Sequence, residues 1–186
     1  MSRTPSNMIP LGTKAPEFTL HDTISGQKLS LSDIRGEVGT VIMFICNHCP
    51  FVIHVNDELI KIANRYADKK ISFVAISSND AQNYPDDAPH LMKKRGKELK
   101  YPFPYLYDET QKVAKDYDAA CTPDIYVYDR ELKLVYRGQL DDSRPGNGIP
   151  LTGSELRYAL DCLLVLKTND RIQKPSIGCN IKWKNK

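Results

Sequence analysis

Two cysteines separated by two residues form the part of this sequence best suited to chemistry. The segment FICNHCPF, residues 44–51, contains Cys46 and Cys49, with His48 between them and Pro50 directly after. Such a pair can hold a metal ion, form a structural disulfide or exchange electrons with another disulfide. The whole chain has five cysteines, an odd number that is too low for a disulfide scaffold of this length.

The pair stands between a predicted buried strand and a predicted amphipathic helix. TVIMFI (40–45) is a continuous apolar run, typical of a strand that is covered on both faces. Pro50 suits the first helical position, because the N–H group there needs no intrahelical partner. The apolar residues that follow form one stripe at helical spacing: Val52, Val55, Leu59, Ile62, Ala63 and Tyr66. A helix N-terminus lowers the pKa of a thiol from about 8.5 to about 3.5–7.5, which favours a reactive thiolate at this position.

Predicted strands and helices alternate along the rest of the chain. Residues 1–16 are expected to be irregular, and the first two strands, at 17–22 and 28–33, to form a hairpin. Later strands are expected at 71–77, 101–108, 124–129 and 134–140, and later helices at 88–99, 109–118 and 154–167. Thr152 and Glu155 match a T-x-x-E capping box before the last helix. This order indicates an α/β sheet that is parallel in part and antiparallel at one edge.

The bulk properties exclude several classes of protein. A chain of 186 residues suits one domain. The net charge of +3 is weak and the lysines are scattered, so we expect no nucleic-acid partner. No run reaches the ~18 apolar residues of a membrane span, so we expect no membrane partner. The N-terminus lacks the apolar region of a signal peptide, and we expect a cytoplasmic protein, where a cysteine pair is more often catalytic or metal-binding than structural.

The sequence resembles the thioredoxin superfamily, and within it the redoxin branch of peroxiredoxin-like proteins and thiol–disulfide oxidoreductases. The resemblance covers roughly residues 12–166 and rests on GTKAPEFTL, the strand–C-x-x-C–P–helix unit, YLYDETQKVAKDYDAACTPDIYVYD and the hairpin beyond it. CNHCP and the C-terminal PSIGCNIKWK match a peroxiredoxin-like group. The resemblance implies a thioredoxin-like α/β fold, a central mixed sheet flanked by helices. It divides the chain into an N-terminal extension (1–16), a thioredoxin-like domain (17–169) and a C-terminal tail docked on the domain (170–186).

The resemblance also implies a mechanism of thiol–disulfide exchange. Cys46, expected at an exposed position, attacks a substrate disulfide as a thiolate, and Cys49 resolves the mixed disulfide. Pro123 matches the family's cis-proline, which follows Thr122, packs against the C-x-x-C segment and leaves a backbone edge for substrate pairing.

The residues beside the pair are expected to tune it. His48 and Pro50 lie at the helix N-terminus, and a histidine there stabilises the thiolate of the reduced form, which makes the disulfide more oxidising. We expect no cofactor. The expected partners are a disulfide-bearing protein or small thiol substrate, and a reductant such as thioredoxin or glutathione.

A thiol-dependent peroxidase, with Cys49 or Cys46 as the peroxidatic thiol, is the main alternative. The peroxiredoxin motif P-x-x-x-T-x-x-C would end at Cys49, but Ile42 stands at its proline position and Cys46 at its threonine position. The buried aspartate and the tryptophan of thioredoxin correspond to Thr40 and Ile45. The sequence therefore identifies no proton acceptor for Cys49.

A zinc site and a non-catalytic binding domain are the remaining alternatives. Structural zinc needs four ligands, and Cys46 and Cys49 supply two without a second pair at ligand spacing, so we expect no metal. A binding domain stays open as an alternative, because a fold alone does not imply a chemistry.

Two further cysteines lie outside the C-x-x-C pair and before the C-terminal tail. Cys162 falls on the apolar side of the last predicted helix and is expected to be a core thiol. Cys121, before the Thr122–Pro123 pair, is either a packing residue or a third thiol near the site.

The C-terminal tail carries apolar residues at alternating positions, namely Ile177, Cys179, Ile181 and Trp183. This spacing predicts an extended segment that lays one face on the domain and buries the large indole of Trp183. Should the segment reach the site, Cys179 becomes a partner for a disulfide with Cys46, Cys49 or Cys121.

The loop DDSRPGNGIPLTG (141–153) is long for a connection in this fold. Long loops near a site are often functional, so we expect it to border the substrate groove with Asp142 and Arg144 available for polar contacts. A plain surface loop is the alternative, because surface loops tolerate insertions readily.

Overall fold

The apolar strand before the cysteine pair becomes the central strand of the fold. All six residues of β4 (Gly39–Phe44) are buried. Val41 and Met43 pack into one hydrophobic cluster, and Ile42 and Phe44 pack into a second. Because successive side chains of a strand point to opposite faces, an all-apolar strand needs cover on both sides, and this sheet provides it.

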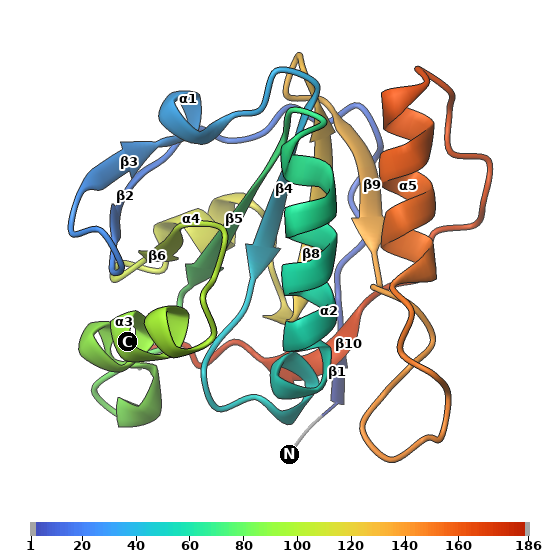
Figure 1. Ribbon diagram of the computed structural model, residues 1–186. Helices are drawn as coiled ribbons and strands as arrows, with labels where there is room; N and C mark the ends of the chain where they lie inside the picture. Colours follow the sequence, from blue (N-terminus) through green and yellow to red (C-terminus); the bar gives the residue numbers. More distant parts are fainter. Residues whose placement is uncertain (1–2, 185–186) are drawn as a thin grey trace.

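The computed structural model describes residues 3–184, and within them the main sheet has seven strands in the order β3-β2-β6-β5-β4-β8-β9. The strands beside β4 are β2 (Thr19–Asp22), β3 (Lys28–Ser30), β5 (Ile71–Ser77), β6 (Tyr105–Tyr107), β8 (Asp124–Asp129) and β9 (Leu134–Gly138). β4, β5 and β6 run parallel, whereas β8 and β9 are antiparallel additions on one side and β2 and β3 on the other. The predicted mixed sheet of a thioredoxin-like fold is confirmed (Figure 1).

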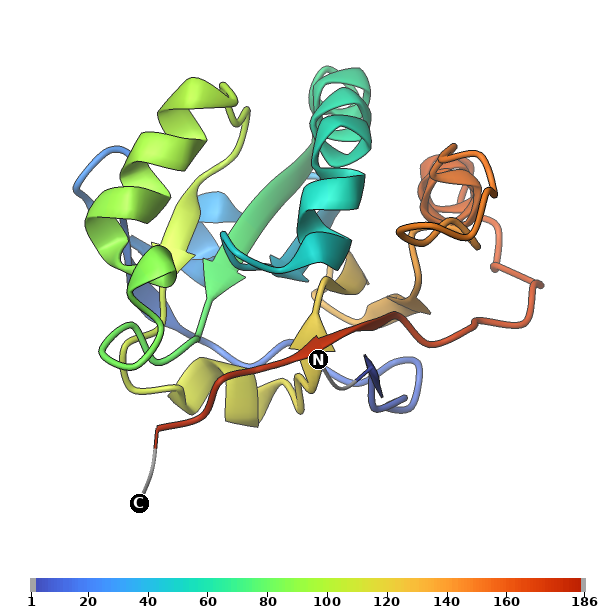
Figure 2. The same ribbon diagram turned by 90° about the horizontal axis from the view of Figure 1, so that it is seen from below.

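Helices cover both faces of the main sheet (Figures 1 and 2). One face carries α2 (Pro50–Ala67), α3 (Pro89–Glu98) and α5 (Ser154–Leu164), and the other carries α1 (Leu31–Ile34) and α4 (Lys112–Asp116). The six residues of the predicted stripe on α2 are all buried, which confirms that interpretation. No helix within residues 3–184 is long and apolar enough to cross a membrane.

A second, small sheet joins both ends of the described chain. Its order is β1 (Arg3–Pro5), β10 (Ile177–Asn180) and β7 (Cys121–Thr122), with antiparallel pairing throughout. Figure 2 shows the C-terminal segment running across the underside of the molecule. The expectation that residues 1–16 are irregular is therefore wrong for β1, because its pairing partner lies at the far end of the sequence.

Two predicted helices differ from their expected form. The helix expected over 109–118 is shortened to α4, because Gln111 adopts a left-handed backbone (φ 61°) and ends the preceding turn. The capping box expected at Thr152 is wrong, because Gly153 is the N-cap of α5. Instead, the carboxylate of Asp141 accepts the backbone N–H groups of Thr152 and Gly153, at 2.7 and 2.6 Å.

A buried ion pair links β8 and β9 of the main sheet. Arg137 on β9 and Asp124 on β8 are 0% exposed, and the guanidinium Nη2 lies 3.1 Å from the carboxylate. The same Nη2 donates to the carbonyl of Asp118 at 2.7 Å. Burial raises the pKa of Asp124 to about 6, against the opposing charge of Arg137.

We predict that Arg137→Met lowers the free energy of unfolding by about 3–5 kcal/mol, because it leaves a carboxylate buried without its partner. Urea unfolding measures the difference. Arg130→Met, at an exposed position in the neighbouring turn, is the matched control and should change stability by less than about 0.5 kcal/mol. Equal stability of the two variants would contradict the assignment.

Candidate active site

The cysteine pair lies in the connection from β4 to α2, with both thiols inside the protein. Cys49 is the N-cap residue of α2, and Pro50 takes the first helical position. Cys46 is 2% exposed and Cys49 is 0% exposed. The exposed position expected for Cys46 is therefore wrong: Cys46 precedes the helix and is buried in one of the two hydrophobic clusters.

Thr122, on β7, contacts both thiols of the pair. Its hydroxyl lies 3.4 Å from Cys46 Sγ, and its carbonyl accepts the thiol of Cys49 at 3.1 Å. The Thr122–Pro123 peptide bond is cis. The loop before β8 thus packs directly on the C-x-x-C segment.

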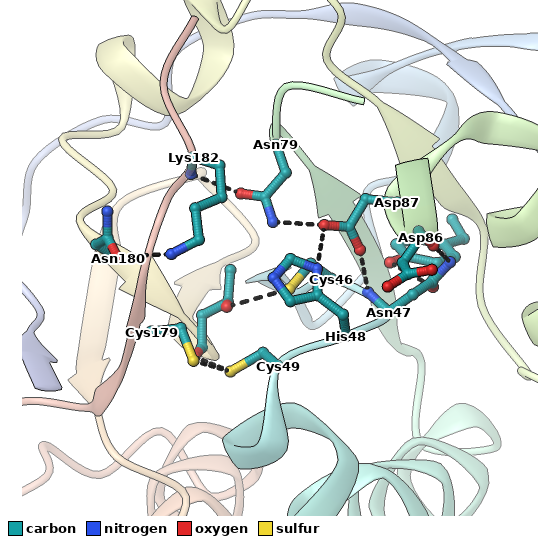
Figure 3. Close-up of polar contacts among 12 residues, drawn as sticks. Cys46, Asn47, His48, Cys49, Asn79, Asp86, Asp87, Cys179, Asn180 and Lys182 are labelled. Carbon is teal, nitrogen blue, oxygen red and sulfur yellow. Dashed lines mark hydrogen bonds and ion pairs between the residues drawn. The ribbon is translucent and has the colours of Figure 1, made fainter. Parts of the chain in front are cut away.

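The C-terminal segment brings a third sulfur to this cluster. Cys179, on β10, lies with its Sγ 3.0 Å from Cys49 Sγ (Figure 3). The register of β10 with β7 pairs Cys179 with Thr122. Cys179 is 2% exposed, as is expected of a strand residue that faces the domain. Cys121 points elsewhere: its thiol donates to the carbonyl of Pro123 at 3.6 Å, and burial raises its pKa.

The surroundings shift the pKa values of the two thiols in opposite directions. The hydrogen bond with Cys46, and then those with Cys179 and Thr122, lower the pKa of Cys49 to about 5 against the cost of burial. The N–H of Val52 in the first turn of α2 adds to this effect, as the N-terminus of a helix stabilises an anion. The same hydrogen bond with Cys49 and burial raise the pKa of Cys46 well above its ordinary value.

A histidine–aspartate pair lies on the other side of Cys46 (Figure 3). His48 Nδ1 is 2.6 Å from the carboxylate of Asp87, a fully buried residue in the 3₁₀ turn Pro85–Asp87. Asp87 also accepts the N–H of Asn47 at 2.7 Å and the side-chain amide of Asn79 at 2.7 Å. Contact with Asp87 raises the pKa of His48. The Nδ1 atom of His48 is therefore directed at the Asp87 carboxylate, which stabilises the imidazolium when the ring is protonated.

Cys46, His48 and Asp87 also form the metal-ligand cluster found among residues 3–184, with their donor atoms within 4.8 Å of one another. The donors do not fit a metal centre well. The Asp87 carboxylate already accepts two protein hydrogen bonds and contacts His48. Structural zinc uses four ligands, and this cluster offers three.

The loop 141–153 borders a groove beside the cis-proline. Phe51, Pro123, Arg144 and Ile177 line this groove. The guanidinium of Arg144 donates to backbone carbonyls of its own loop, which holds the side chain against the groove wall. Asp142 instead pairs with Lys174, at 2.9 Å.

The expected burial of Trp183 is wrong. Trp183 is 40% exposed, with the ammonium of Lys115 lying 5.7 Å from the ring centroid. The centre of the tail is what is buried, at Cys179 and Ile181. Cys162 is buried on α5, as expected.

Sequence reasoning missed Asp87 and Asn79. A usable signal exists: β4 and β5 are parallel neighbours, so the segment after β5 begins at the same sheet edge as the cysteine pair. Polar residues that follow adjacent parallel strands tend to gather at that edge. The segment SNDAQNYPDDAP, residues 78–89, carries both residues.

The chain is similar to one family of known proteins and to solved structures of two bacterial proteins. The family model described as AhpC/TSA family matches residues 11–137. An uncharacterized conserved protein from Geobacillus kaustophilus has 62% identity, with a TM-score of 0.98 over 100% of this chain and 98% of that one. A hypothetical protein from Sinorhizobium meliloti 1021 has 48% identity, with a TM-score of 0.95 over 97% of this chain and 98% of that one.

A more distant structure shares the fold. The thioredoxin domain of a thiol-disulfide oxidoreductase from Bacteroides vulgatus has 24% identity, with a TM-score of 0.58 over 74% of this chain and 91% of that one. Among curated proteins, none matches the sequence.

We predict that Cys49 ionises with a midpoint near pH 5 in the reduced protein, because hydrogen bonds from neighbouring thiols stabilise its anion. Thiolate absorbance in the ultraviolet, followed against pH and subtracted from that of Cys49→Ser, measures the midpoint. A midpoint near the ordinary thiol value of about 8.5 would contradict the prediction. Cys162→Ser, remote from the cluster, should leave the titration unchanged.

A second prediction concerns the pair of His48 and Asp87. Asp87→Asn should lower the pKa of His48 toward its ordinary value of about 6.5, because the charge that stabilises the imidazolium is removed. NMR titration of the imidazole measures this shift. Asp86→Asn is the matched control at the exposed neighbouring position, and a shift of the same size there would contradict the specific role of Asp87.

Proposed function

The chain belongs to the AhpC/TSA family, and from this premise we propose that it is a thiol–disulfide oxidoreductase in which Cys49 is the attacking thiolate. Cys46 then acts as the resolving thiol. This assignment reverses the roles expected from the sequence, where Cys46 attacks and Cys49 resolves.

One observation carries the proposal: Cys49 is the N-cap residue of α2 and contacts Thr122 and Cys179, whereas Cys46 lies outside this position. The pKa of Cys49 is lowered to about 5, whereas that of Cys46 is raised by its hydrogen bond with Cys49 and by burial. The surroundings of the pair therefore favour the thiolate at Cys49 over that at Cys46. Since the thiolate is the nucleophile, Cys49 is the sulfur poised to attack.

The exchange proceeds in two balanced steps. The Cys49 thiolate attacks a substrate disulfide, forms a mixed disulfide and releases the first substrate thiolate. Cys46 loses its proton and attacks the mixed disulfide at the sulfur of Cys49, which releases the second substrate thiolate. The substrate gains two electrons, and the protein holds a Cys46–Cys49 disulfide until a dithiol or thiol reductant reverses the process.

The second step needs a base for Cys46, and we assign this role to the neutral form of His48. Its imidazole belongs to the cluster in which the donor atoms of Cys46, His48 and Asp87 lie within 4.8 Å of one another. Asp87 orients the ring and stabilises the imidazolium that forms when the proton arrives. This supplies the proton acceptor that sequence reasoning left unassigned, although for Cys46 rather than Cys49.

The expected partners follow from the site. The substrate is a disulfide on a small molecule or a flexible peptide, because the thiols are buried and lie beside a groove lined by Phe51, Pro123 and Arg144. The reductant is a thiol or dithiol of the thioredoxin or glutathione type.

A thiol-dependent peroxidase is the second candidate, and the burial of Cys49 favours it. A peroxide is small enough to reach a thiol that is 0% exposed more easily than a protein disulfide is. In this reaction the Cys49 thiolate attacks one peroxide oxygen to form a sulfenic acid and an alcohol or water. Cys46 then condenses with the sulfenic acid, and water leaves. Peroxide consumption at a rate exceeding that of disulfide exchange would favour this candidate.

We predict that Cys46→Ser still releases the first substrate thiol, whereas Cys49→Ser does not, because only Cys49 begins the exchange. The release of thionitrobenzoate from its symmetric aromatic disulfide gives the measurement. Cys162→Ser is the control for reaction at other buried thiols. If Cys46→Ser failed to release the first substrate thiol and Cys49→Ser still released it, the roles expected from the sequence would be correct.

We also predict a reduction potential for the Cys46–Cys49 disulfide above the roughly −270 mV of thioredoxin. The stabilised Cys49 thiolate favours the reduced form, and a favoured reduced form makes the disulfide more oxidising. Equilibration with a glutathione redox buffer measures the potential. A value below that of thioredoxin would contradict the stabilised thiolate.

A further inference from the structure

The C-terminal segment Ser176–Lys182, called the strap below, lies across the thiol cluster and places its own cysteine against Cys49. We propose that Cys179 is a second resolving thiol, so that the mixed disulfide on Cys49 can be resolved from the strap as well as from Cys46. The proposal rests on the proposed function, in which Cys49 is the attacking thiolate.

The strap is held at the backbone edge beside the cis-proline. Cys179 pairs with Thr122, and Asn180 pairs with Cys121, in an antiparallel register. This is the place where the sequence resemblance leads one to expect an extended substrate. In this chain the edge is already filled by the chain's own strand, which delivers a thiol in the position of a substrate sulfur.

Gly178 makes this close approach feasible. A Cβ atom added at Gly178 would lie 1.9 Å from the carbonyl oxygen of Thr122 and 2.7 Å from its carbonyl carbon. Both are backbone atoms, which cannot rotate away as a flexible side chain can. The strap therefore needs a residue without a side chain next to Cys179.

The two sulfurs are placed for bond formation. Cys49 Sγ and Cys179 Sγ are 3.0 Å apart, about 1 Å more than the length of a disulfide bond. Because each of these sulfurs is already held by its own strand or helix, a small local movement brings them to bonding distance. Cys46 and Cys179 contact Cys49 from two different elements, and Cys49 can bond to only one of them at a time.

The chemistry balances without a further reagent. After Cys49 attacks a substrate disulfide, Cys179 attacks the mixed disulfide at the sulfur of Cys49. The Cys49–Cys179 bond forms, the bond to the substrate breaks, and the leaving substrate thiolate takes the proton that Cys179 gives up. Cys46 can then give up its proton and attack the sulfur of Cys49. The Cys46–Cys49 bond forms, the Cys49–Cys179 bond breaks, and the leaving Cys179 takes the proton and returns to the thiol form.

The strap is anchored beyond the cysteine, next to the proposed base. Lys182 donates its N–H to Asn79 at 2.8 Å, and its carbonyl accepts the N–H of Asp80 and the side-chain amide of Gln111, both at 2.8 Å. The amide of Asn79 in turn donates to Asp87, the partner of His48 (Figure 3). These hydrogen bonds fix the strap three residues after Cys179, in addition to the strand pairing of Cys179 with Thr122.

The test compares single and double variants with the same aromatic disulfide. Cys46→Ser should release two thiols per chain and end with a Cys49–Cys179 disulfide, identified by peptide mapping without reduction. Cys46→Ser/Cys179→Ser should release one thiol and retain the aromatic adduct on Cys49. Cys46→Ser/Cys162→Ser is the matched control and should behave as Cys46→Ser.

A backbone variant tests the strap without removing a thiol. Gly178→Ala in the Cys46→Ser background should displace the strap, so that the aromatic adduct on Cys49 persists although Cys179 is present. Lys184→Ala, at an exposed position two residues beyond the strap, should leave resolution intact.

Two outcomes would overturn the inference, and they differ in meaning. A persistent adduct on Cys49 in Cys46→Ser, equal to that in the double variant, rejects Cys179 as a resolving thiol and leaves the proposed function standing. No release of the first thiol in Cys46→Ser/Cys179→Ser rejects Cys49 as the attacking thiolate, and the inference falls with it.

Discussion

The site depends on the two residues of β7. Thr122 receives the thiol of Cys49 on its carbonyl, contacts Cys46 through its hydroxyl and pairs with Cys179 through its backbone. Three sulfurs from two distant parts of the chain, the C-x-x-C segment and β10, thus meet around one threonine. The conformation of the Thr122–Pro123 segment is in turn fixed on its other side by Asp124, whose ion pair with Arg137 is wholly buried. A change in the pairing of β7 with β10 would therefore move the sulfurs apart without altering any cysteine itself.

Much of the fold could be predicted from local patterns. The short apolar run of β4, rich in β-branched residues, indicates a strand, and the stripe on α2 indicates a helix. Together they place the cysteine pair at a strand–helix junction. Pro50 marked the start of α2 without knowledge of anything distant. These signals are local, because hydrophobic periodicity and proline geometry act over a few residues.

The parts that could not be predicted depend on contacts between distant segments. The burial of Cys46 follows from packing under Thr122, seventy-six positions along the chain. The pairing of β1 with β10 joins the two ends of the described chain. β1 has three residues and β10 has four, and segments this short carry no sequence pattern that identifies a pairing partner. The acidity order of the thiols is likewise a property of the assembled cluster, since the pKa of Cys49 depends on Cys46, Cys179 and Thr122 together. Helix position alone did not give that order.

The exposed indole at the end of the strap has an optical consequence. Trp183 is the single tryptophan of the chain, and it follows Lys182, the residue that anchors the strap to the segment after β5. Its ring lies half in solvent beside the ammonium of Lys115, outside both hydrophobic clusters. The tryptophan fluorescence of this protein therefore comes from one place, the outer end of the C-terminal segment. Its emission wavelength and its quenching by iodide report the attachment of that segment in real time, independently of the tyrosine-rich interior.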